Sequence, residues 1–557
     1  SAFRGGLEYR LTRRLEIKDV RLTYAPASSI GKYGGDIDNW MWPRHTGDFA
    51  FYRAYVGPDG QPAEYSEDNV PFTPPSHLKL YSEPLADGDF VMVAGYPGRT
   101  NRYRRLSEVE NAFYWSYPER IKLYSAWIEA IEAAAPKGSD AHIKYASLLA
   151  GLNNATKNYG GQLEGAERVG LVDRRKAREA ALNDWINADP ARAEKYGDAV
   201  KALDELVEAD QATRERDLYY ALATRTAPLR QARRLIRLAN ERQKPDAERE
   251  SGYQERDMAF FKQGLEAMDR RYDADVDKAV WAMFIKQYLA LPDDQQVGEF
   301  NTALGLSRDM SDKKLNKVLS RYFAKTKMGD KETRLGLMEA SLDDLKTSKD
   351  PFINLAMQLY ASDMTEEERE KDIAGQFQLL RPKYMDAIIA WQEDQGQPVY
   401  PDANSTLRVT FGTVKGDVSP KDGLVYTPFT TLDGITQKYT GEDPFDSPDK
   451  QMLAIEEKTF GGYVEESLGS VPVNFLTTLD VTGGNSGSPT FNAKGELVGL
   501  LFDGTYESVN SDWDFDTEST RSIHVDARYM LWVMDVIDGA HNLLDEMGVA
   551  PSIEDAE

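Results

Sequence analysis

Residues 482–489 read TGGNSGSP and place a serine, Ser486, on a glycine-rich bend just before an apolar strand predicted at 497–502. Glycine is required where such a bend uses backbone angles that side chains with a Cβ avoid. On this bend the backbone N–H groups of Gly484 and Ser486 can converge on one point and form an oxyanion hole. The pattern therefore predicts a nucleophilic serine. A Gly/Ser-rich hairpin without chemistry is the alternative.

A serine nucleophile needs a base and a group that orients the base. In trypsin-like enzymes the chain order is His, then Asp, then Ser. Asp48 opens an aromatic-rich run, 48–56, whose two faces are both largely apolar. A carboxylate at the mouth of a buried strand can hold an imidazole in one tautomer and remain ionised. Asp48 is the predicted orienting acid. Its alternative role is to cap a turn after Gly47.

The histidines do not supply an obvious base. The chain has five, and only His45 precedes Asp48. In an extended segment, residues three apart point to opposite faces, so His45 could not readily turn its ring onto Asp48. The other four break the expected order: His77, His142, His524 and His541. We expect structural roles for all five. We place the catalytic histidine upstream of Ser1 and expect the chain without it to be inactive.

Several rare strings carry a resemblance to a known family. They are Asn39-Trp40 with Asp48 nine residues beyond Asn39, GLNNA at 151–155, GNSGSP at 484–489 and FDG at 502–504. Over nearly its whole length and in this order, the chain resembles the bacterial dipeptidyl-peptidase 7 and 11 group, serine peptidase family 46. The resemblance implies that Ser486 is the nucleophile and Asp48 the orienting acid. It also implies a site for the substrate's free α-amino group, made by Asn39, Trp40, Asn154 and Asp503.

An amine-binding set is reasonable on chemical grounds too. An enzyme that removes dipeptides must recognise an N-terminal ammonium, and a carboxylate with amide oxygens does so through charge-assisted hydrogen bonds. Asp503 follows Ser486 by seventeen residues, beyond a predicted strand, where trypsin-like enzymes build the wall of the specificity pocket. Each member has another reading. Asn39 and Asn154 suit turns, Trp40 suits a core, and 154–156 spells a glycosylation acceptor.

Gly504 bears on substrate choice. The resemblance implies that the acidic-specific branch has an arginine at this position, which pairs with an Asp or Glu side chain of the substrate. Gly504 has no side chain, so we expect an open, uncharged pocket that prefers a hydrophobic residue before the cleaved bond, as in the dipeptidyl-peptidase 7 branch. The alternative is that Gly504 serves only an Asp-Gly turn.

The chain of 557 residues exceeds what one hydrophobic core usually organises. From about 107 to 392 it reads as consecutive helices, with short strand-like runs before 100 and after 404. Ser107 with Glu110, and Thr365 with Glu368, have the spacing of capping boxes. We expect an α+β fold, a chymotrypsin-like double β-barrel with a large inserted α-helical cap. The predicted domains are 1–103 (an N-terminally truncated barrel part), 104–400 (the cap) and 401–557 (the barrel part carrying the nucleophile).

The insertion has two possible uses. As a cap it would close the cleft where a longer substrate's N-terminal extension would run, which converts an endopeptidase frame into an exopeptidase. The alternative is a helical domain for oligomerisation, such as a homodimer, or for partner binding. Either use is compatible with a serine nucleophile.

Composition excludes several function classes. A net charge of −25 argues against nucleic acid as a partner. No cysteine is present, and no apolar run approaches the length of a membrane span. We expect no metal or cofactor, peptides with a free N-terminus as partners, and, from the resemblance alone, a periplasmic location. The predicted function is a serine exopeptidase that releases dipeptides. A trypsin-like endopeptidase and an inactive peptide-binding protein are the alternatives.

Overall fold

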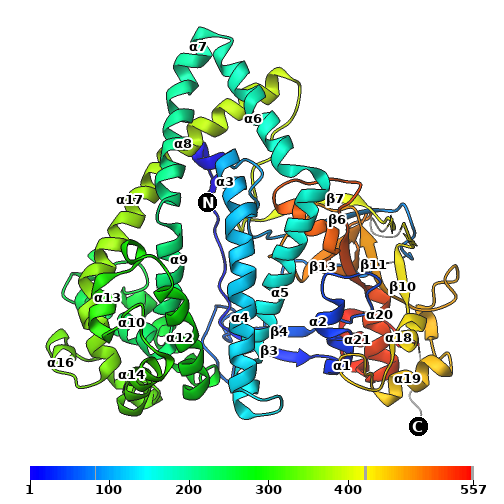
Figure 1. Ribbon diagram of the computed structural model, residues 1–557. Helices are drawn as coiled ribbons and strands as arrows, with labels where there is room; N and C mark the ends of the chain where they lie inside the picture. Colours follow the sequence, from blue (N-terminus) through cyan, green and yellow to red (C-terminus); the bar gives the residue numbers. More distant parts are fainter. Residues whose placement is uncertain (82, 419–422, 553–557) are drawn as a thin grey trace. The chain divides into compact units, whose positions relative to one another are not determined.

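The computed structural model describes residues 1–81, 83–418 and 423–552 and divides into two compact units (Figure 1). The first, here the strand unit, comprises 1–104, 157–181 and 388–557. The second, the helical unit, comprises 105–156 and 182–387. Residues 157–181 lie inside the predicted insertion, yet they group with the strands.

The main sheet of the strand unit has seven strands, and every neighbouring pair is antiparallel. In spatial order the strands are β10 (Phe429–Thr431), β11 (Pro472–Thr477), β14 (Ser522–Asp526), β13 (Leu497–Gly504), β12 (Ser488–Asn492), β6 (Phe90–Gly95) and β7 (Arg408–Thr413). The runs predicted as strands at 90–98, 407–412 and 497–502 are confirmed as β6, β7 and β13. Strands from both ends of the chain thus share one sheet.

The predicted pair of closed barrels is not confirmed, because no sheet of the described residues closes. The two ends of the strand row approach each other at one point. There an isolated antiparallel bridge joins Val414, just after β7, to Thr477 at the end of β11. The described residues show a protein of mixed helices and sheets.

A smaller sheet pairs β3 (Asp19–Tyr24), β4 (Phe51–Val56) and β5 (Val70–Pro71). The strand predicted after Asp48 is confirmed as β4, but its expected burial is wrong. Tyr52 is 67% exposed, and only Val56 of this strand is buried. Asp48 lies in the irregular segment before β4 rather than at the mouth of a buried strand.

Short helices cover the strand unit's core. They are α1 (Ser28–Gly31), α2 (Gly35–Asp38), α18 (Leu432–Lys438), α19 (Asp449–Glu456), α20 (Ala527–Trp532) and α21 (His541–Met547). Tyr529 and Trp532 of α20 are buried in one cluster with Val473 of β11 and Leu432 of α18. Because β11 is buried along its whole length, it presents apolar side chains to cores on both faces.

The helical unit is built from helices between 106 and 387, and α5, α6 and α17 continue into the strand unit. Its helices are α3 (Leu106–Asn111), α4 (Tyr117–Ala134), α5 (Asp140–Val169), α6 (Leu171–Asn187), α7 (Pro190–Arg192), α8 (Asp198–Gln211), α9 (Arg214–Ala223), α10 (Ala227–Glu241), α11 (Met258–Glu266), α12 (Ala274–Leu289), α13 (Gly298–Leu304), α14 (Asp312–Lys325), α15 (Lys331–Leu337), α16 (Leu342–Lys346) and α17 (Pro351–Asp394). The predicted helical stretch is therefore confirmed.

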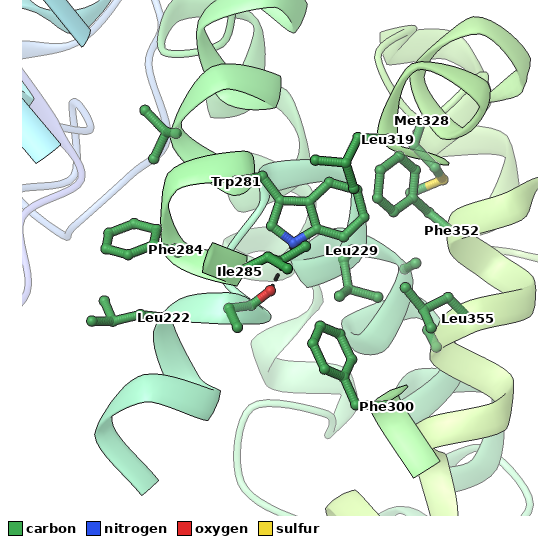
Figure 2. Packing of buried hydrophobic residues seen from close by; sticks show 14 of the residues in the cluster. Leu222, Leu229, Trp281, Phe284, Ile285, Phe300, Leu319, Met328, Phe352 and Leu355 are labelled. Carbon is green, nitrogen blue, oxygen red and sulfur yellow. Dashed lines mark hydrogen bonds between the residues drawn. The ribbon is translucent and has the colours of Figure 1, made fainter. Parts of the chain in front are cut away.

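Aromatic side chains organise the helical core, as Figure 2 shows around Trp281. The Trp281 indole N–H donates to the Ala223 carbonyl at the end of α9 at 2.7 Å, which satisfies its one polar atom. Phe352 lies 5.4 Å from the Trp281 ring, measured between centroids. This packing joins α9, α12 and α17. No helix of the described residues has the length and apolarity to cross a membrane.

Both predicted capping boxes are wrong. Ser107 lies inside α3. At the start of this helix the Arg105 N–H donates to the Glu108 carboxylate at 3.0 Å, and the Glu108 N–H donates to the Arg105 backbone carbonyl, also at 3.0 Å. Thr365 lies within the long helix α17. A capping sequence starts a helix only where the chain is not already helical, and α17 is continuous through this position.

Candidate active site

The segment that carries the predicted nucleophile, Ser486, is a tight turn that leads into β12. Ser486 is exposed, and the turn is closed by hydrogen bonds from the Asn485 N–H to the Thr482 carbonyl (3.1 Å) and from the Gly487 N–H to the Leu501 carbonyl (2.7 Å). Gly484 has φ of 102°, and a Cβ there would lie 2.7 Å from the backbone of the segment 96–98. Only glycine fits at Gly484, both for its backbone angle and for the space around it.

Two backbone donors in this turn are available. In the part of the chain that the structure describes, neither the Gly484 N–H nor the Ser486 N–H donates to a protein acceptor. Both residues are exposed. An exposed turn with uncommitted N–H groups beside a serine hydroxyl provides the donors that an oxyanion hole uses.

The β12–β13 hairpin brings Ser486, which precedes β12, close to Asp503 and Gly504 at the end of β13. Ser488 pairs with Leu501, so the turn before β12 lies beside the end of β13. The Ser486 hydroxyl donates to the Phe502 carbonyl at 3.4 Å. Ser486 is thus adjacent to Asp503 and Gly504, although they are distant in sequence.

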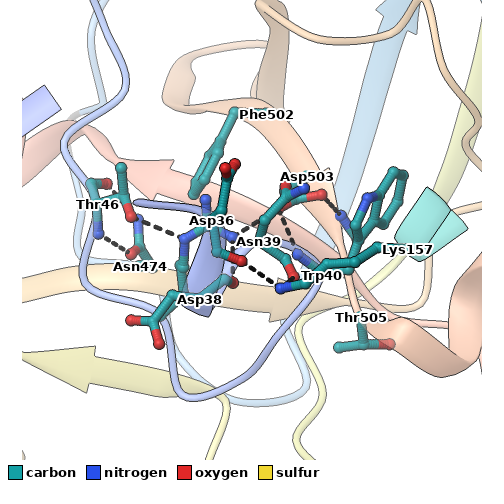
Figure 3. Close-up of polar contacts among 12 residues, drawn as sticks. Asp36, Asp38, Asn39, Trp40, Thr46, Lys157, Asn474, Phe502, Asp503 and Thr505 are labelled. Carbon is teal, nitrogen blue, oxygen red and sulfur yellow. Dashed lines mark hydrogen bonds and ion pairs between the residues drawn. The ribbon is translucent and has the colours of Figure 1, made fainter. Parts of the chain in front are cut away.

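Asp503 is the centre of the polar network in Figure 3. One of its carboxylate oxygens accepts from the Arg44 guanidinium at 2.6 Å and from the Trp40 backbone N–H at 3.1 Å. The other accepts from the Gly504 N–H at 2.9 Å. The side chains of Arg44 and Asp503 are 9% and 7% exposed, so the pair is nearly buried. These contacts tie the N-terminal segment to the end of β13.

The segment that carries Trp40 and Arg44 has no regular structure and is held by side chains. Trp40 has φ of 61°, a left-handed conformation that is costly for a residue with a side chain. Arg44 also donates to the Asp38 carbonyl and the Thr46 hydroxyl, each at 2.7 Å. The Asn474 side chain of β11 accepts from the Thr46 N–H at 2.9 Å and donates to its carbonyl at 3.0 Å (Figure 3).

Lys157 of α5 binds the backbone of the segment that carries Trp40. Its ammonium donates to the Asp36 carbonyl and, at 3.3 Å each, to the Ile37 and Asn39 carbonyls (Figure 3). Burial lowers the Lys157 pKa, while Asp36 acts in the opposite direction. Lys157 therefore fixes the backbone just before Trp40.

Asp48 is exposed, and within the described part of the chain its carboxylate has no hydrogen-bond or ion-pair partner. Desolvation by the surrounding protein raises its pKa, Arg44 opposes that change, and Asp503 reinforces it. The two charges of the Arg44–Asp503 pair thus act on the Asp48 pKa in opposite directions. Its carboxylate is available for a partner such as an imidazole.

None of the five histidines hydrogen-bonds to Ser486 or Asp48 in the described structure. His45 is 4% exposed, and burial lowers its pKa to about 3. His524 is fully buried among the hydroxyls of Thr477, Thr490 and Ser522. His541 pairs with Asp535 at 2.9 Å. His77 and His142 lie outside the strands of the main sheet.

The surroundings of Gly504 define the candidate pocket wall. A Cβ there would lie 2.5 Å from the Ser508 hydroxyl, 3.5 Å from the Arg521 carbonyl oxygen and 3.6 Å from the Trp40 indole. None of these three groups is cationic. Trp40 therefore contributes its backbone N–H to Asp503 and its ring to the space beside Gly504.

The structure gathers seven of the eight residues that the sequence nominates into the strand unit: Asn39, Trp40, Asp48, Gly484, Ser486, Asp503 and Gly504. Asn154 belongs to the helical unit, in α5. Sequence reasoning missed Arg44 and Lys157. Both lie close in sequence to predicted site residues, which is the signal that could have identified them. Arg44 lies between Asn39 and Asp48, and Lys157 follows Asn154 by three residues. Their roles become clear only from the groups that they contact in the folded protein, the Asp503 carboxylate for Arg44 and the backbone carbonyls before Trp40 for Lys157.

No group of three or more His, Asp or Glu side chains in the described ranges is arranged to hold a metal ion. The polar groups of this site are a hydroxyl, backbone N–H groups, the carboxylates of Asp48 and Asp503, and two cations. Such a set can bind a peptide main chain and stabilise a developing oxyanion.

Comparisons with known proteins agree on one family. The Peptidase S46 family model matches residues 1–549. An Asp/Glu-specific dipeptidyl-peptidase of Shewanella putrefaciens is 43% identical over 98% of this chain and 76% of its own length. Dipeptidyl-peptidase 7 of Capnocytophaga gingivalis is 33% identical over 98% of this chain and 74% of its own length.

The fold matches as well. The crystal structure of Porphyromonas endodontalis DPP11 in complex with the dipeptide Arg-Glu superposes with a TM-score of 0.78 at 28% identity, covering 99% of this chain and 77% of that one. Sequence and fold therefore agree over nearly the whole chain, which belongs to the peptidase S46 family.

Proposed function

We propose that this protein is a serine dipeptidyl-peptidase, which removes dipeptides from the free N-terminus of peptides. The observation that carries the proposal is the contact of the Ser486 hydroxyl with the Phe502 carbonyl, beside Asp503. This contact supports the proposal, because the Ser486 hydroxyl, two uncommitted backbone N–H groups and the Asp503 carboxylate lie within one small region. The relatives named above as dipeptidyl-peptidases support the same reaction class.

The proposed mechanism is acyl transfer. Ser486 attacks the carbonyl carbon of the second peptide bond while a histidine takes its proton, and the Gly484 and Ser486 N–H groups bind the oxyanion. The same histidine then protonates the leaving amine, which leaves the dipeptide bound to Ser486 as an ester. Water, deprotonated by the histidine, hydrolyses this ester and releases the free dipeptide. We place this histidine outside the five of this chain, oriented by Asp48, because in the part of the chain that the structure describes none of the five hydrogen-bonds to Ser486 or Asp48.

Amine recognition is assigned to Asp503, Asn39, Trp40 and Asn154. The Asp503 carboxylate already accepts three hydrogen bonds, and a carboxylate offers about four acceptor sites, so one remains for an ammonium. Arg44 compensates part of its charge. We therefore assign Asp503 mainly to orienting the amine, with amide oxygens of Asn39 and Asn154 sharing the ammonium's donors.

We propose that the residue before the cleaved bond is hydrophobic. The support is the absence of a side chain at Gly504 and the uncharged groups around it, Ser508, a backbone oxygen and the Trp40 indole. A preference for Asp or Glu is the second candidate. The name of the Shewanella putrefaciens relative favours it, and so does the Arg-Glu dipeptide in the matched DPP11 structure.

Three further proposals concern the frame of the strand unit, the role of the helical unit and the location of the protein. We propose that the strand unit corresponds to a chymotrypsin-like frame, with the Val414–Thr477 bridge as the seam of one barrel. We propose that the helical unit caps the cleft and makes it an exopeptidase site. By its family, we place the protein in the periplasm.

The direct test is hydrolysis of paired substrates by a protein that contains this chain together with the proposed catalytic histidine. A dipeptidyl-coumarin with a free amine should be cleaved, and its N-acetylated form should not be. The penultimate residue is varied among Leu, Phe, Asp and Glu to decide between the two specificities. Cleavage of N-blocked peptides at internal bonds would instead support the endopeptidase alternative.

A further inference from the structure

Two cavities in the helical unit share a pair of arginines. One, of about 320 Å³, is lined by residues that include Trp127, Lys144 and Asp277. The other, of about 490 Å³, is lined by residues that include Tyr253 and Asp363. Arg225, in the connection between α9 and α10, and Arg230 of α10 line both. The two cavities therefore have these two arginines in common.

The lining of these cavities is positively charged in a strongly negative protein. Seven cationic side chains and three carboxylates line them, while the chain as a whole has a net charge of −25. Like charges gathered on one concave surface repel one another, and the cost falls when an anion binds between them. The local charge thus points to an anionic ligand.

Only part of this positive charge is neutralised by carboxylates. Arg233 donates to Asp363 at 2.9 Å, and Arg237 to Glu367 at 3.0 Å. Within the described residues, Arg225, Arg230 and Arg234 have no ion pair with a carboxylate. These three guanidinium groups keep donors for a ligand.

Aromatic rings hold two of these arginines in place. The Arg225 guanidinium lies 5.0 Å from the Trp127 ring centre, and that of Arg234 lies 4.4 Å from the Phe261 ring centre. Burial lowers the pKa of Arg225 and of Arg234, and the nearby Arg230 lowers both further. A guanidinium stacked on an aromatic face is oriented before the ligand arrives, so it loses less entropy on binding.

Trp127 adds a second, independent observation. Its side chain is 6% exposed, and within the described structure its indole N–H is buried without an acceptor. Buried indole N–H groups usually have a partner. An unsatisfied donor in the cavity wall beside Arg225 indicates that acceptor atoms belong at this place.

We propose that Arg225 and Arg230 form the centre of a binding site for a small polyanion with two or more phosphate or carboxylate groups. Guanidinium groups bind both kinds of oxyanion through paired hydrogen bonds. The cavity volumes fall in the range of small-molecule sites. This site is separate from the candidate active site, all of whose strand-unit residues lie outside both cavity linings.

The experiment is calorimetric titration of the intact protein with pyrophosphate and with citrate, in chloride buffers of low and high ionic strength. We expect binding that weakens with salt, as screening requires. The double variant Arg225→Gln/Arg230→Gln should bind the better of the two anions at least about tenfold more weakly. Comparison of the two titrants distinguishes a phosphate site from a carboxylate site.

Arg321→Gln is the matched control. Arg321 is an exposed arginine of α14 that lines neither cavity, and among the described residues its one hydrogen bond is to the Lys317 carbonyl, at 3.4 Å. It makes the same change of charge per site and should leave the affinity unchanged. Each protein's unfolding temperature without ligand checks that it is folded, and Arg230→Gln alone serves if the double variant is not. The proposal is overturned if neither anion binds the wild type, or if the Arg225 and Arg230 variants bind as it does.

Discussion

Arg44 and Asp503 form an ion pair of 2.6 Å in which neither side chain is more than a tenth exposed. The pair joins the irregular segment after α2 to the end of β13. The Arg44 guanidinium also lies over the Phe502 ring, 5.2 Å from its centre. The residue proposed to orient the substrate amine is thus itself positioned by a cation that sequence reasoning did not select.

Breaking this pair from one side should be costly. Arg44→Met and Asp503→Asn should each reduce the free energy of unfolding by about 3 kcal/mol, because each leaves a buried group without its counter-charge. The double variant should lose less than the sum, by at least about 1 kcal/mol. Urea unfolding of the four proteins measures this coupling. Strictly additive losses would show that the two residues do not interact in solution.

Ser486→Ala should abolish dipeptide release by the natural protein. Loss of a triad nucleophile typically costs several orders of magnitude in kcat, while an exposed turn residue contributes little to stability. The unfolding temperature should stay unchanged. Ser467→Ala is the matched control and should retain activity, because Ser467 is an exposed serine between η8 (Gly461–Tyr463) and β11. Undiminished turnover by Ser486→Ala would rule out this residue as the nucleophile.

Lys157→Met should raise the KM for substrates with a free amine by about tenfold, with a smaller effect on kcat. Its ammonium holds the carbonyls of Asp36 and Asn39, so without it the backbone that presents Asn39 and Trp40 loosens. Lys157→Arg should restore part of the loss. The control is Lys201→Met, whose side chain is 79% exposed. An equal KM for Lys157→Met and wild type contradicts a positioning role.

Gly504→Arg should shift the preference from hydrophobic toward acidic penultimate residues, because a guanidinium there can pair with a carboxylate. The new Cβ would lie 2.5 Å from the Ser508 hydroxyl, which donates to the Thr505 carbonyl at 2.6 Å. We therefore expect the shift to be clearer in Gly504→Arg/Ser508→Ala, with Ser508→Ala alone as control. An unchanged ratio of kcat/KM values for Glu and Leu substrates would mean that Gly504 does not line the pocket.

Stability should fall on acidification, partly through His524. Burial lowers its pKa to about 3 in the folded protein, whereas an unfolded histidine titrates near 6.5. Between these values the unfolded state binds more protons, so the free energy of unfolding rises with pH, by up to about 1.4 kcal/mol per pH unit. Above pH 6.5 the contribution is fully present.

His524→Gln is the variant that isolates this effect, since its amide can still meet the hydroxyls of Thr477 and Thr490 and does not titrate. Its free energy of unfolding should depend less steeply on pH between about 4.5 and 6.5 than that of wild type. Subtracting the two curves cancels other groups, including the buried His45. Parallel curves would show that His524 is protonated equally in both states.

Much of the fold was predictable from local sequence. The helical stretch begins and ends close to the predicted limits, and Leu203, Leu206 and Val207 are buried on one face of α8 as their spacing indicates. The glycines at 484 and 487 do adopt positive φ. These features depend on residues a few positions apart, whose preferences act within one turn or one helix.

Other properties required the tertiary structure. The sequence shows that Ser486 and Asp503 are both present, but only the antiparallel pairing of β12 with β13 makes them neighbours. Closure of the sheet depends on pairing between β7 and β11, which is limited to one bridge. Whether Arg44, Lys157 and Arg225 meet a carboxylate, a carbonyl or an aromatic ring is decided by segments far away in the chain. A charge's effect depends on its partners and its solvation, and folding determines both.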